Sequence, residues 1–352
     1  MLAHNRQHVA MSLGDYDSVL LLSFGGPEGP EDVVPFLENV TRGRDIPQER
    51  LEQVGAHYEL FGGRSPINDQ NRALIAALKA ELSRRDHDLP ICWGNRNWHP
   101  LLADTLSEMV SNGIRRSLVL VTSAFSSYSG CRQYYDDIDK VRAEFGPDAP
   151  ELDRVRVLWN HPGFLGATTD RLVTALQDRS LAPVAASTRV AFSAHSIPSA
   201  MASECDYQLQ LEEASRMVMD MSQLANHGIH HDVVYQSRSG PPQVPWLEPD
   251  ICTYVRDAAN DGANHVVVVP IGFVSDHMEV VYDLDTEAAK VAQDSEVEFT
   301  RVPTVGQHPQ FVSALVDLLE ERAGLRVDRP VLGSLPARPD VCASGCCPRP
   351  TR

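Results

Sequence analysis

The chain has 352 residues, of which 43% are hydrophobic and 22% charged, a composition typical of globular proteins and large enough for two hydrophobic cores. Its formal net charge of −17 argues against a nucleic-acid partner, because phosphate binding requires a basic face. No apolar run reaches the roughly 18 residues of a membrane span, and the polar start over 1–17 lacks the apolar stretch of a secretory signal. We therefore expect a cytoplasmic protein without a disulfide framework.

Candidate strands and helices alternate along the chain, which predicts parallel sheets built from βα units. Four candidate strands lie in each half, so we expect two four-stranded sheets. In chain order the expected strands are 19–22, 91–93, 118–122, 155–159, 190–194, 233–236, 266–270 and 297–302. The expected helices include 71–85, 101–112, 209–224, 250–260 and 310–323.

Short segments are similar between the two halves. Residues 118–125 align with 266–273, and 19–27 align with 190–198. This repeat predicts two similar lobes that face each other across a cleft, with Phe24 and His195 at matching positions. We expect a flexible N-terminus over 1–15, an N-terminal lobe over 16–165, a C-terminal lobe over 166–325 and a cysteine-containing tail over 326–352.

A buried strand followed by a polar cluster is the strongest local signal for a functional site. Four consecutive valines over 266–269 predict a strand buried on both faces, and Asp276, His277 and Glu279 follow it. Chemistry in parallel sheets sits beyond the carboxyl ends of strands. A helix through this region would place Glu279 and Asp283 on one side. A structural role is also predicted and is compatible with the functional one, because Asp276 followed three residues later by Glu279 matches a capping box.

The tail contains a second cluster of reactive side chains. Cys342, Cys346 and Cys347 follow a proline-rich stretch over 330–339. Clustered thiols in a chain without a secretory signal favour metal binding over disulfides. The residues alone leave an iron–sulfur cluster, a zinc site and a disordered tail with free thiols as alternatives.

Five motifs occur in an order that resembles the ferrochelatase family. They are LLLSFGGPE over 20–28, FGGRSPI over 61–67, SAHSIP over 193–198, QSRSGPPQVPWL over 236–247 and GFVSDHME over 272–279. The chain is most similar to the actinobacterial enzymes that metallate coproporphyrin. The resemblance implies an α/β fold like that of class II chelatases, with two Rossmann-like lobes, each a four-stranded parallel sheet flanked by helices, and a porphyrin cleft between them.

The implied activity is a lyase reaction of haem biosynthesis, the insertion of Fe(II) into coproporphyrin III to give coproheme. The free porphyrin must bend and lose two N–H protons before the metal enters, and histidine suits both proton transfer and iron binding. By resemblance, His195 and Glu279 are the catalytic residues and the ligands of the substrate Fe²⁺. From its surroundings alone, His195 has a plainer interpretation as a hydrogen-bonded histidine at the start of a loop.

The resemblance also implies a set of residues that contact the porphyrin. An acidic protein needs a local group of arginines to bind four propionates, and arginine forks match carboxylates. The alternative for such arginines is solvated surface charge. Phenylalanine at position 24, where some relatives carry tyrosine, has no atom that can ligate the metal. The implied contacts are Phe24, Arg42, Arg44, Tyr58, Ser65 and Tyr128.

The family resemblance also implies a fourth cysteine ligand, which lies outside the tail. By resemblance, Cys131 joins Cys342, Cys346 and Cys347 as ligands of a [2Fe–2S] cluster, which we expect to attach the tail to the first lobe. Three alternative functions stay open: metal insertion into protoporphyrin IX, cobalt insertion into a related tetrapyrrole, and a two-lobed haem or metal carrier without insertase activity. The expected partners are the porphyrin, Fe(II) and, transiently, a downstream decarboxylase of the haem pathway.

Overall fold

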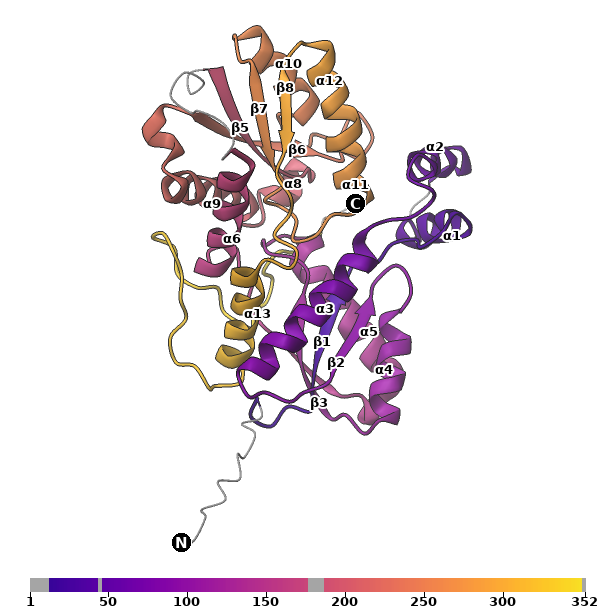
Figure 1. The fold of residues 1–352 in the computed structure, drawn as a ribbon. Helices are drawn as coiled ribbons and strands as arrows, with labels where there is room; N and C mark the ends of the chain where they lie inside the picture. Colours follow the sequence, from indigo (N-terminus) through magenta and orange to yellow (C-terminus); the bar gives the residue numbers. More distant parts are fainter. Residues whose placement is uncertain (1–12, 44–45, 177–186, 350–352) are drawn as a thin grey trace, which may run out of the picture.

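The computed structural model describes residues 13–43, 46–176 and 187–349, which form two α/β lobes (Figure 1). Each lobe contains a four-stranded parallel sheet, with the orders β2-β1-β3-β4 and β6-β5-β7-β8. The expected pair of four-stranded sheets is therefore confirmed. The first sheet contains β1 (Ser18–Ser23), β2 (Ile91–Asn95), β3 (Arg116–Val121) and β4 (Glu151–Arg154). The second contains β5 (Thr188–His195), β6 (His230–Gln236), β7 (His265–Val269) and β8 (Glu298–Arg301).

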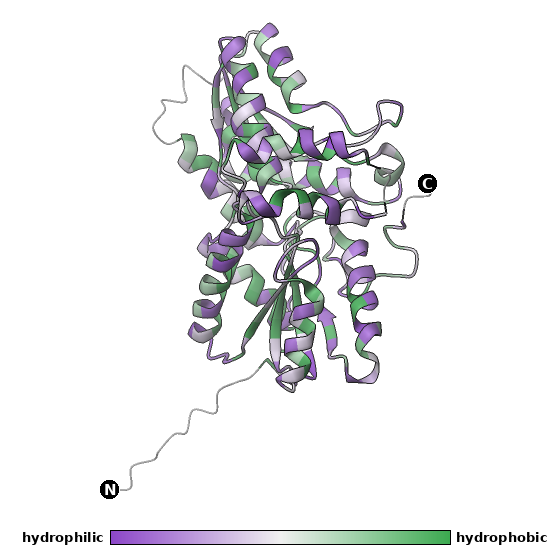
Figure 2. Ribbon diagram, turned by 90° about the vertical axis from the view of Figure 1, so that its right-hand side faces the viewer, coloured by the Kyte–Doolittle hydropathy of each residue, from purple (hydrophilic) through white to green (hydrophobic). Residues whose placement is uncertain are grey.

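The first strand of each lobe lies inside its sheet, with the second strand on one side and the third on the other. All six residues of β1 and all five of β7 are buried, because helices cover both faces of each sheet. Figure 2 shows the strands mainly in hydrophobic colours, while the helices alternate between hydrophobic and hydrophilic residues. The matching strand orders agree with the repeat expected from the sequence.

The fourth strand of the first lobe differs from the expectation. The prediction placed it at 155–159, but β4 is Glu151–Arg154 and pairs with β3 in the register Arg116↔Glu151. Val155 and Trp159 are buried in the main hydrophobic core, with exposed fractions of 7% and 2%. The apolar run that suggested a strand therefore belongs to the packed segment after the strand, and the edge strand itself is polar.

Helices connect the strands and cover the sheets. The five expected helices are confirmed, with ends displaced by a few residues. The helix that follows the polar cluster runs from Met278 to Asp294 and contains a π-helical section.

Helices of the first lobe region are α1 (Pro30–Val40), α2 (Gln48–Glu59), α3 (Ile67–Arg84), α4 (Leu102–Ser111), η1 (Tyr128–Arg132), α5 (Gln133–Phe145), η2 (Gly146–Asp148) and α6 (Pro162–Leu176). Those that follow are α8 (Ser199–Ala202), α9 (Tyr207–Ser222), η4 (Leu224–His227), α10 (Ile251–Asn260), α11 (Met278–Val280), η5 (Val281–Ala288), α12 (Ala289–Asp294) and α13 (Pro309–Arg322).

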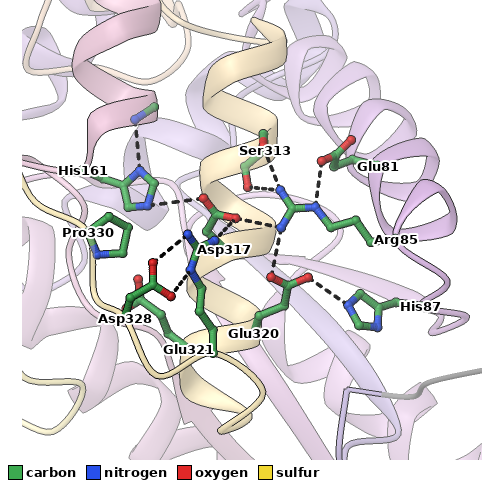
Figure 3. A network of polar contacts seen from close by, with 12 residues as sticks. Glu81, Arg85, His87, His161, Ser313, Asp317, Glu320, Glu321, Asp328 and Pro330 are labelled. Atoms are coloured by element: carbon green, nitrogen blue, oxygen red, sulfur yellow. Dashed lines mark hydrogen bonds and ion pairs between the residues drawn. The ribbon is translucent and has the colours of Figure 1, made fainter.

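Two helices cross between the lobes. After the second sheet, α13 returns to pack against α3 and α6, while α6 also packs against α9 of the second lobe. Figure 3 shows the polar contacts around α13. Arg85, at the end of α3, donates to Asp317 at 2.7 Å and to Glu320 at 3.0 Å. Among the described residues, no helix is long and apolar enough to cross a membrane.

Replacing Arg85 with alanine should destabilise the protein. Its side chain is only 15% exposed, so its removal leaves Asp317 and Glu320 partly buried and without this counter-ion, at a cost of about 2–3 kcal/mol. Arg84→Ala is the matched control, because the Arg84 side chain is 66% exposed and solvent screens its ion pair with Glu81. Urea unfolding measures both variants, and equal losses would contradict this account.

Candidate active site

The carboxyl ends of the second sheet bring the predicted catalytic residues together. His195 ends the interior strand β5, and in the parallel register it lies beside Gln236, which ends β6. The chain that leaves β7 returns over this edge, and Gly272 lies so close to β5 that a Cβ atom there would be 2.6 Å from the Cβ of Ala194. The glycine therefore permits the close approach that leads the chain on to Glu279.

His195 and Glu279 form the centre of the site. Nε2 of His195 lies 3.6 Å from Oε2 of Glu279, and the two side chains are 34% and 52% exposed, so a ligand can reach both. The other ring nitrogen, Nδ1, donates to the carbonyl oxygen of Ser196 at 2.5 Å. Because a carbonyl only accepts, Nδ1 carries the hydrogen of the neutral ring, and the lone pair lies on Nε2.

The capping-box interpretation of Asp276 and Glu279 is wrong. The residue that precedes the helix is His277, and no side chain caps it. The carboxylate of Asp276 instead accepts from Arg301 of β8 at 3.1 Å, and Arg301 also pairs with Asp285. The ion pair with this arginine, which lies on the neighbouring strand, therefore holds the Asp276 carboxylate away from the start of the helix.

Glu279 begins a series of carboxylates along the helix, followed by Asp283 and Glu287. Asp283 accepts from Ser237 at 2.5 Å and from the Gln236 amide at 3.4 Å. Burial, with smaller contributions from the charges of Glu279 and Glu287, raises the pKa of Asp283 from 3.8 to about 7. Burial and the charge of Asp250 also raise the pKa of Glu287. Asp283 can therefore gain and lose a proton near neutral pH.

Gln236 is a member of the site to which the sequence analysis assigned no role. Its side chain is buried, and its amide donates to the backbone oxygen of Glu279 at 3.1 Å as well as to Asp283. It thereby connects the end of β6 to the helix that carries both carboxylates. Its place at the end of a predicted strand, in line with His195, was the signal that could have identified it.

Residues of the first lobe approach this helix from the other side. The His57 ring of α2 stacks on Tyr282, with centroids 3.8 Å apart. Tyr58 is buried beside Phe36, and burial, together with the charge of Glu279, raises its pKa. Phe24 directly follows β1, contacts Phe36 edge-on and is 37% exposed. Helices α1 and α2 therefore pack aromatic side chains against the start of the second-lobe helix.

The other predicted porphyrin contacts are dispersed. Arg42 is exposed just after α1, and Arg44 lies outside the described residues. Ser65 is 3% exposed and lies against Gly26. Tyr128 is 7% exposed, and its hydroxyl accepts from Arg349 of the tail at 2.7 Å. Within the described part of the chain, the side-chain hydrogen bonds of Tyr128 and Ser65 do not join them to His195.

The predicted cysteine ligands also come together, at the first lobe. Cys131, Cys342, Cys346 and Cys347 line two adjoining spaces, one of about 150 Å³ and a much smaller one that arginines also line, together here called the cysteine hollow. Sγ atoms of Cys346 and Cys347 are 3.7 Å apart. A hydrogen bond from Cys342, with help from the charge of Arg154, lowers the pKa of Cys131 to about 6. Within the described ranges, no group of three His, Cys, Asp or Glu side chains has the arrangement of a metal-ion site.

Arginines form the inner wall of the cysteine hollow. Arg154, Arg156 and Arg338 line it, and each has one buried guanidinium nitrogen without a hydrogen-bond partner within the described structure. Arg338 donates to Sγ of Cys346 at 3.7 Å, and Arg154 to Sγ of Cys131 at 3.9 Å. Buried cationic donors of this kind favour an anionic occupant or thiolates.

Comparison with known proteins places this geometry in a family. The family model described as Ferrochelatase matches residues 16–323. The ferrochelatase of Rhodopirellula baltica is 50% identical over 336 residues, 95% of this chain and 94% of that protein. The coproporphyrin III ferrochelatase of Streptomyces coelicolor is 50% identical over 356 residues, 95% of this chain and 93% of that protein.

Solved structures support the fold. SirB from Bacillus subtilis, in a structure with Fe³⁺, has a TM-score of 0.53 at 11% identity and covers 87% of this chain and 95% of its own. That likeness shows two Rossmann-like lobes and nothing of the substrate. The family match and the two relatives extend over nearly the whole chain, and on these grounds the chain belongs to the ferrochelatase family.

Proposed function

We propose that this protein is a coproporphyrin III ferrochelatase, which inserts Fe(II) into coproporphyrin III to give coproheme. The observation that carries the proposal is the pair of His195 Nε2 and Glu279 Oε2, 3.6 Å apart and accessible at the carboxyl ends of a parallel sheet. Relatives named for this substrate, from Streptomyces coelicolor and Streptomyces griseus, are 50% and 49% identical. Metal insertion into a porphyrin is a lyase reaction.

His195 and Glu279 supply the two functions that metallation requires. The lone pair on Nε2 of His195 can accept a proton from a pyrrole N–H or bind the incoming iron. Glu279 then stabilises the imidazolium, or provides an oxygen ligand to Fe(II). In this scheme, Asp283 and Glu287 lie on the outward route for protons, since the pKa of Asp283 is near neutral, and their carboxylate oxygens are also suited to the inward passage of hydrated iron.

Binding of the propionates requires positive charge near the site. A net charge of −17 repels a tetracarboxylate, so cationic side chains near the site must attract it. We assign this task to Arg42 and Arg44, and contact with the ring to Phe24, whose phenyl group cannot ligate iron. Contacts from Tyr58, Ser65 and Tyr128, a cytoplasmic location and transfer of the product to a decarboxylase remain predictions.

We also propose that the cysteine hollow holds a [2Fe–2S] cluster. Four cysteines from two distant segments line the hollow, the number such a cluster requires. The buried, unpaired arginine nitrogens suit the negative charge of a cluster with four thiolate ligands. When bound, the cluster would supply a covalent cross-link between the tail and the first lobe. Cys131 would be the ligand from the first lobe, and the other cysteines would be the ligands from the tail.

Metallation of both porphyrins under anaerobic conditions tests the enzyme proposal. The protein should metallate coproporphyrin III faster than protoporphyrin IX, as followed by absorbance. His195→Ala should lower the rate by about 10²-fold or more while porphyrin binding persists. His230→Ala, an exposed histidine at the start of β6, is the control. Faster turnover of protoporphyrin IX would favour the alternative substrate, and binding without metallation would indicate a carrier.

Asp283→Asn should flatten the pH dependence of stability. The folded pKa of Asp283, about 7, exceeds its ordinary 3.8, so the folded protein retains a proton that the unfolded chain releases. This stabilisation is complete below about pH 4 and is lost as pH rises to about 7, whereas asparagine does not titrate. Between pH 5 and 8, urea unfolding should show the wild type losing roughly 2–3 kcal/mol relative to the variant. Parallel curves would contradict the raised pKa.

Cys346→Ser should remove the visible absorbance of the purified protein and lower its melting temperature, because one ligand and one cross-link of the tail are lost. Cys92→Ser is the matched control, since Cys92 lies on β2 and does not line the cysteine hollow. Iron and sulfide analysis of both variants gives a second measure. Normal colour and melting of the Cys346 variant would end the cluster proposal.

A further inference from the structure

The cysteine hollow is connected to helix α9 of the second lobe by a charged contact. Arg338, which lines the hollow, donates through Nη2 to Cys346 and through Nη1 to Asp206 at 2.7 Å. Asp206 directly precedes α9, and its side chain does not cap the helix. One guanidinium therefore contacts both a thiol of the hollow and the start of α9.

A second contact joins the same helix to the hollow. Ser126 lines the hollow, and its backbone N–H donates to Oε1 of Gln210 at 2.8 Å. The Gln210 amide donates back to the Ser126 hydroxyl at 2.9 Å. Both residues are at most 2% exposed, and Gln210 is one helical turn after Asp206. The first turn of α9 is thus attached to the hollow at two points.

Between these two points lies a residue that contacts the active site. Tyr207 is 6% exposed, and its hydroxyl donates to the backbone oxygen of His195 at 3.0 Å. Its ring packs edge-on against Phe125, which precedes Ser126 in the chain, with centroids 6.3 Å apart. A movement of the start of α9 would therefore act on the end of β5, where the catalytic imidazole is attached.

We propose that Asp206 and Tyr207 are positioning residues that couple the cysteine hollow to His195. With the hollow filled, Arg338 is fixed, the start of α9 is fixed by it, and the Tyr207 hydroxyl sets the position of the His195 backbone. With the hollow emptied, no occupant holds the Cys346 thiol that Arg338 contacts, so Arg338 is less firmly fixed and the imidazole is less well placed. The inference rests on the proposed metallation reaction and on the proposed occupant of the hollow. Such coupling must be reciprocal for binding, so an occupant of either site affects the other.

A double-mutant cycle tests the coupling. Tyr207→Phe keeps the ring but removes the hydroxyl, and should lower kcat about fivefold with KM for porphyrin unchanged. Asp206→Asn should lower kcat about threefold and Asp206→Glu should restore it. If both act through one contact, the double variant should be no slower than Tyr207→Phe alone. Effects that multiply, or wild-type kcat in both single variants, would overturn the proposal.

The control is Asp220→Asn, which removes an exposed ion pair with Arg216 at the other end of α9 and should leave kcat unchanged. A second readout does not depend on activity or on the cluster. In NMR spectra, the His195 ring signals should shift in Tyr207→Phe and in Asp206→Asn, and should not shift in Asp220→Asn. Unshifted signals in both test variants would overturn the coupling even in an active enzyme.

Failure of the coupling can be distinguished from failure of the proposed function. Lack of metallation by the wild type would contradict the enzyme proposal, and lack of visible absorbance would contradict the cluster. In either case the NMR comparison still tests whether Asp206 and Tyr207 position His195. Visible absorbance retained in Asp206→Asn, together with a lower kcat and shifted His195 signals, is the result that supports the coupling.

Discussion

The interior position of β5 is the constraint on which the rest of the site depends. Because β5 pairs with β6 on one side and β7 on the other, its last residue, His195, lies where two neighbouring strands also end. Gln236 from β6 and the helix that follows β7 therefore have to meet it there. His195 is thus held by the hydrogen bonds of the sheet, which is more rigid than a surface loop, and Gln236 attaches the backbone of Glu279 to the end of β6.

The site also depends on how the lobes are joined. Helix α13 returns from the second lobe to pack on α3, and Arg85 pairs with its carboxylates. On another side, Gln210 and Ser126 exchange two buried hydrogen bonds between the lobes. Helix α2 contacts the helix of Glu279 through the stack of His57 on Tyr282. Several separate contacts thus fix the first lobe relative to His195 and Glu279.

Charge is distributed to suit two opposite demands. Carboxylates collect along one helix, where burial raises the pKa of Asp283 and lets it exchange protons near neutral pH. Arginines collect around the cysteine hollow, where buried donors favour thiolates. A strongly acidic chain can therefore contain one region suited to a cation and another suited to an anionic group, since local burial outweighs the screened charge of the whole surface.

The sequence alone determined the βα alternation and the two four-stranded sheets, because strand periodicity is local, while the pairing of His195 with Glu279 was implied by the family resemblance. It misplaced the fourth strand at 155–159, since an apolar run does not say whether its residues pair in a sheet or pack beneath one. It also proposed a cap for Asp276, because the partner Arg301 comes from a distant strand. The raised pKa of Asp283, the bond of Tyr128 to Arg349 and the link from Cys346 through α9 to His195 were decided by tertiary structure alone. Each of these depends on burial or on contacts between residues far apart in the chain, which no local pattern encodes.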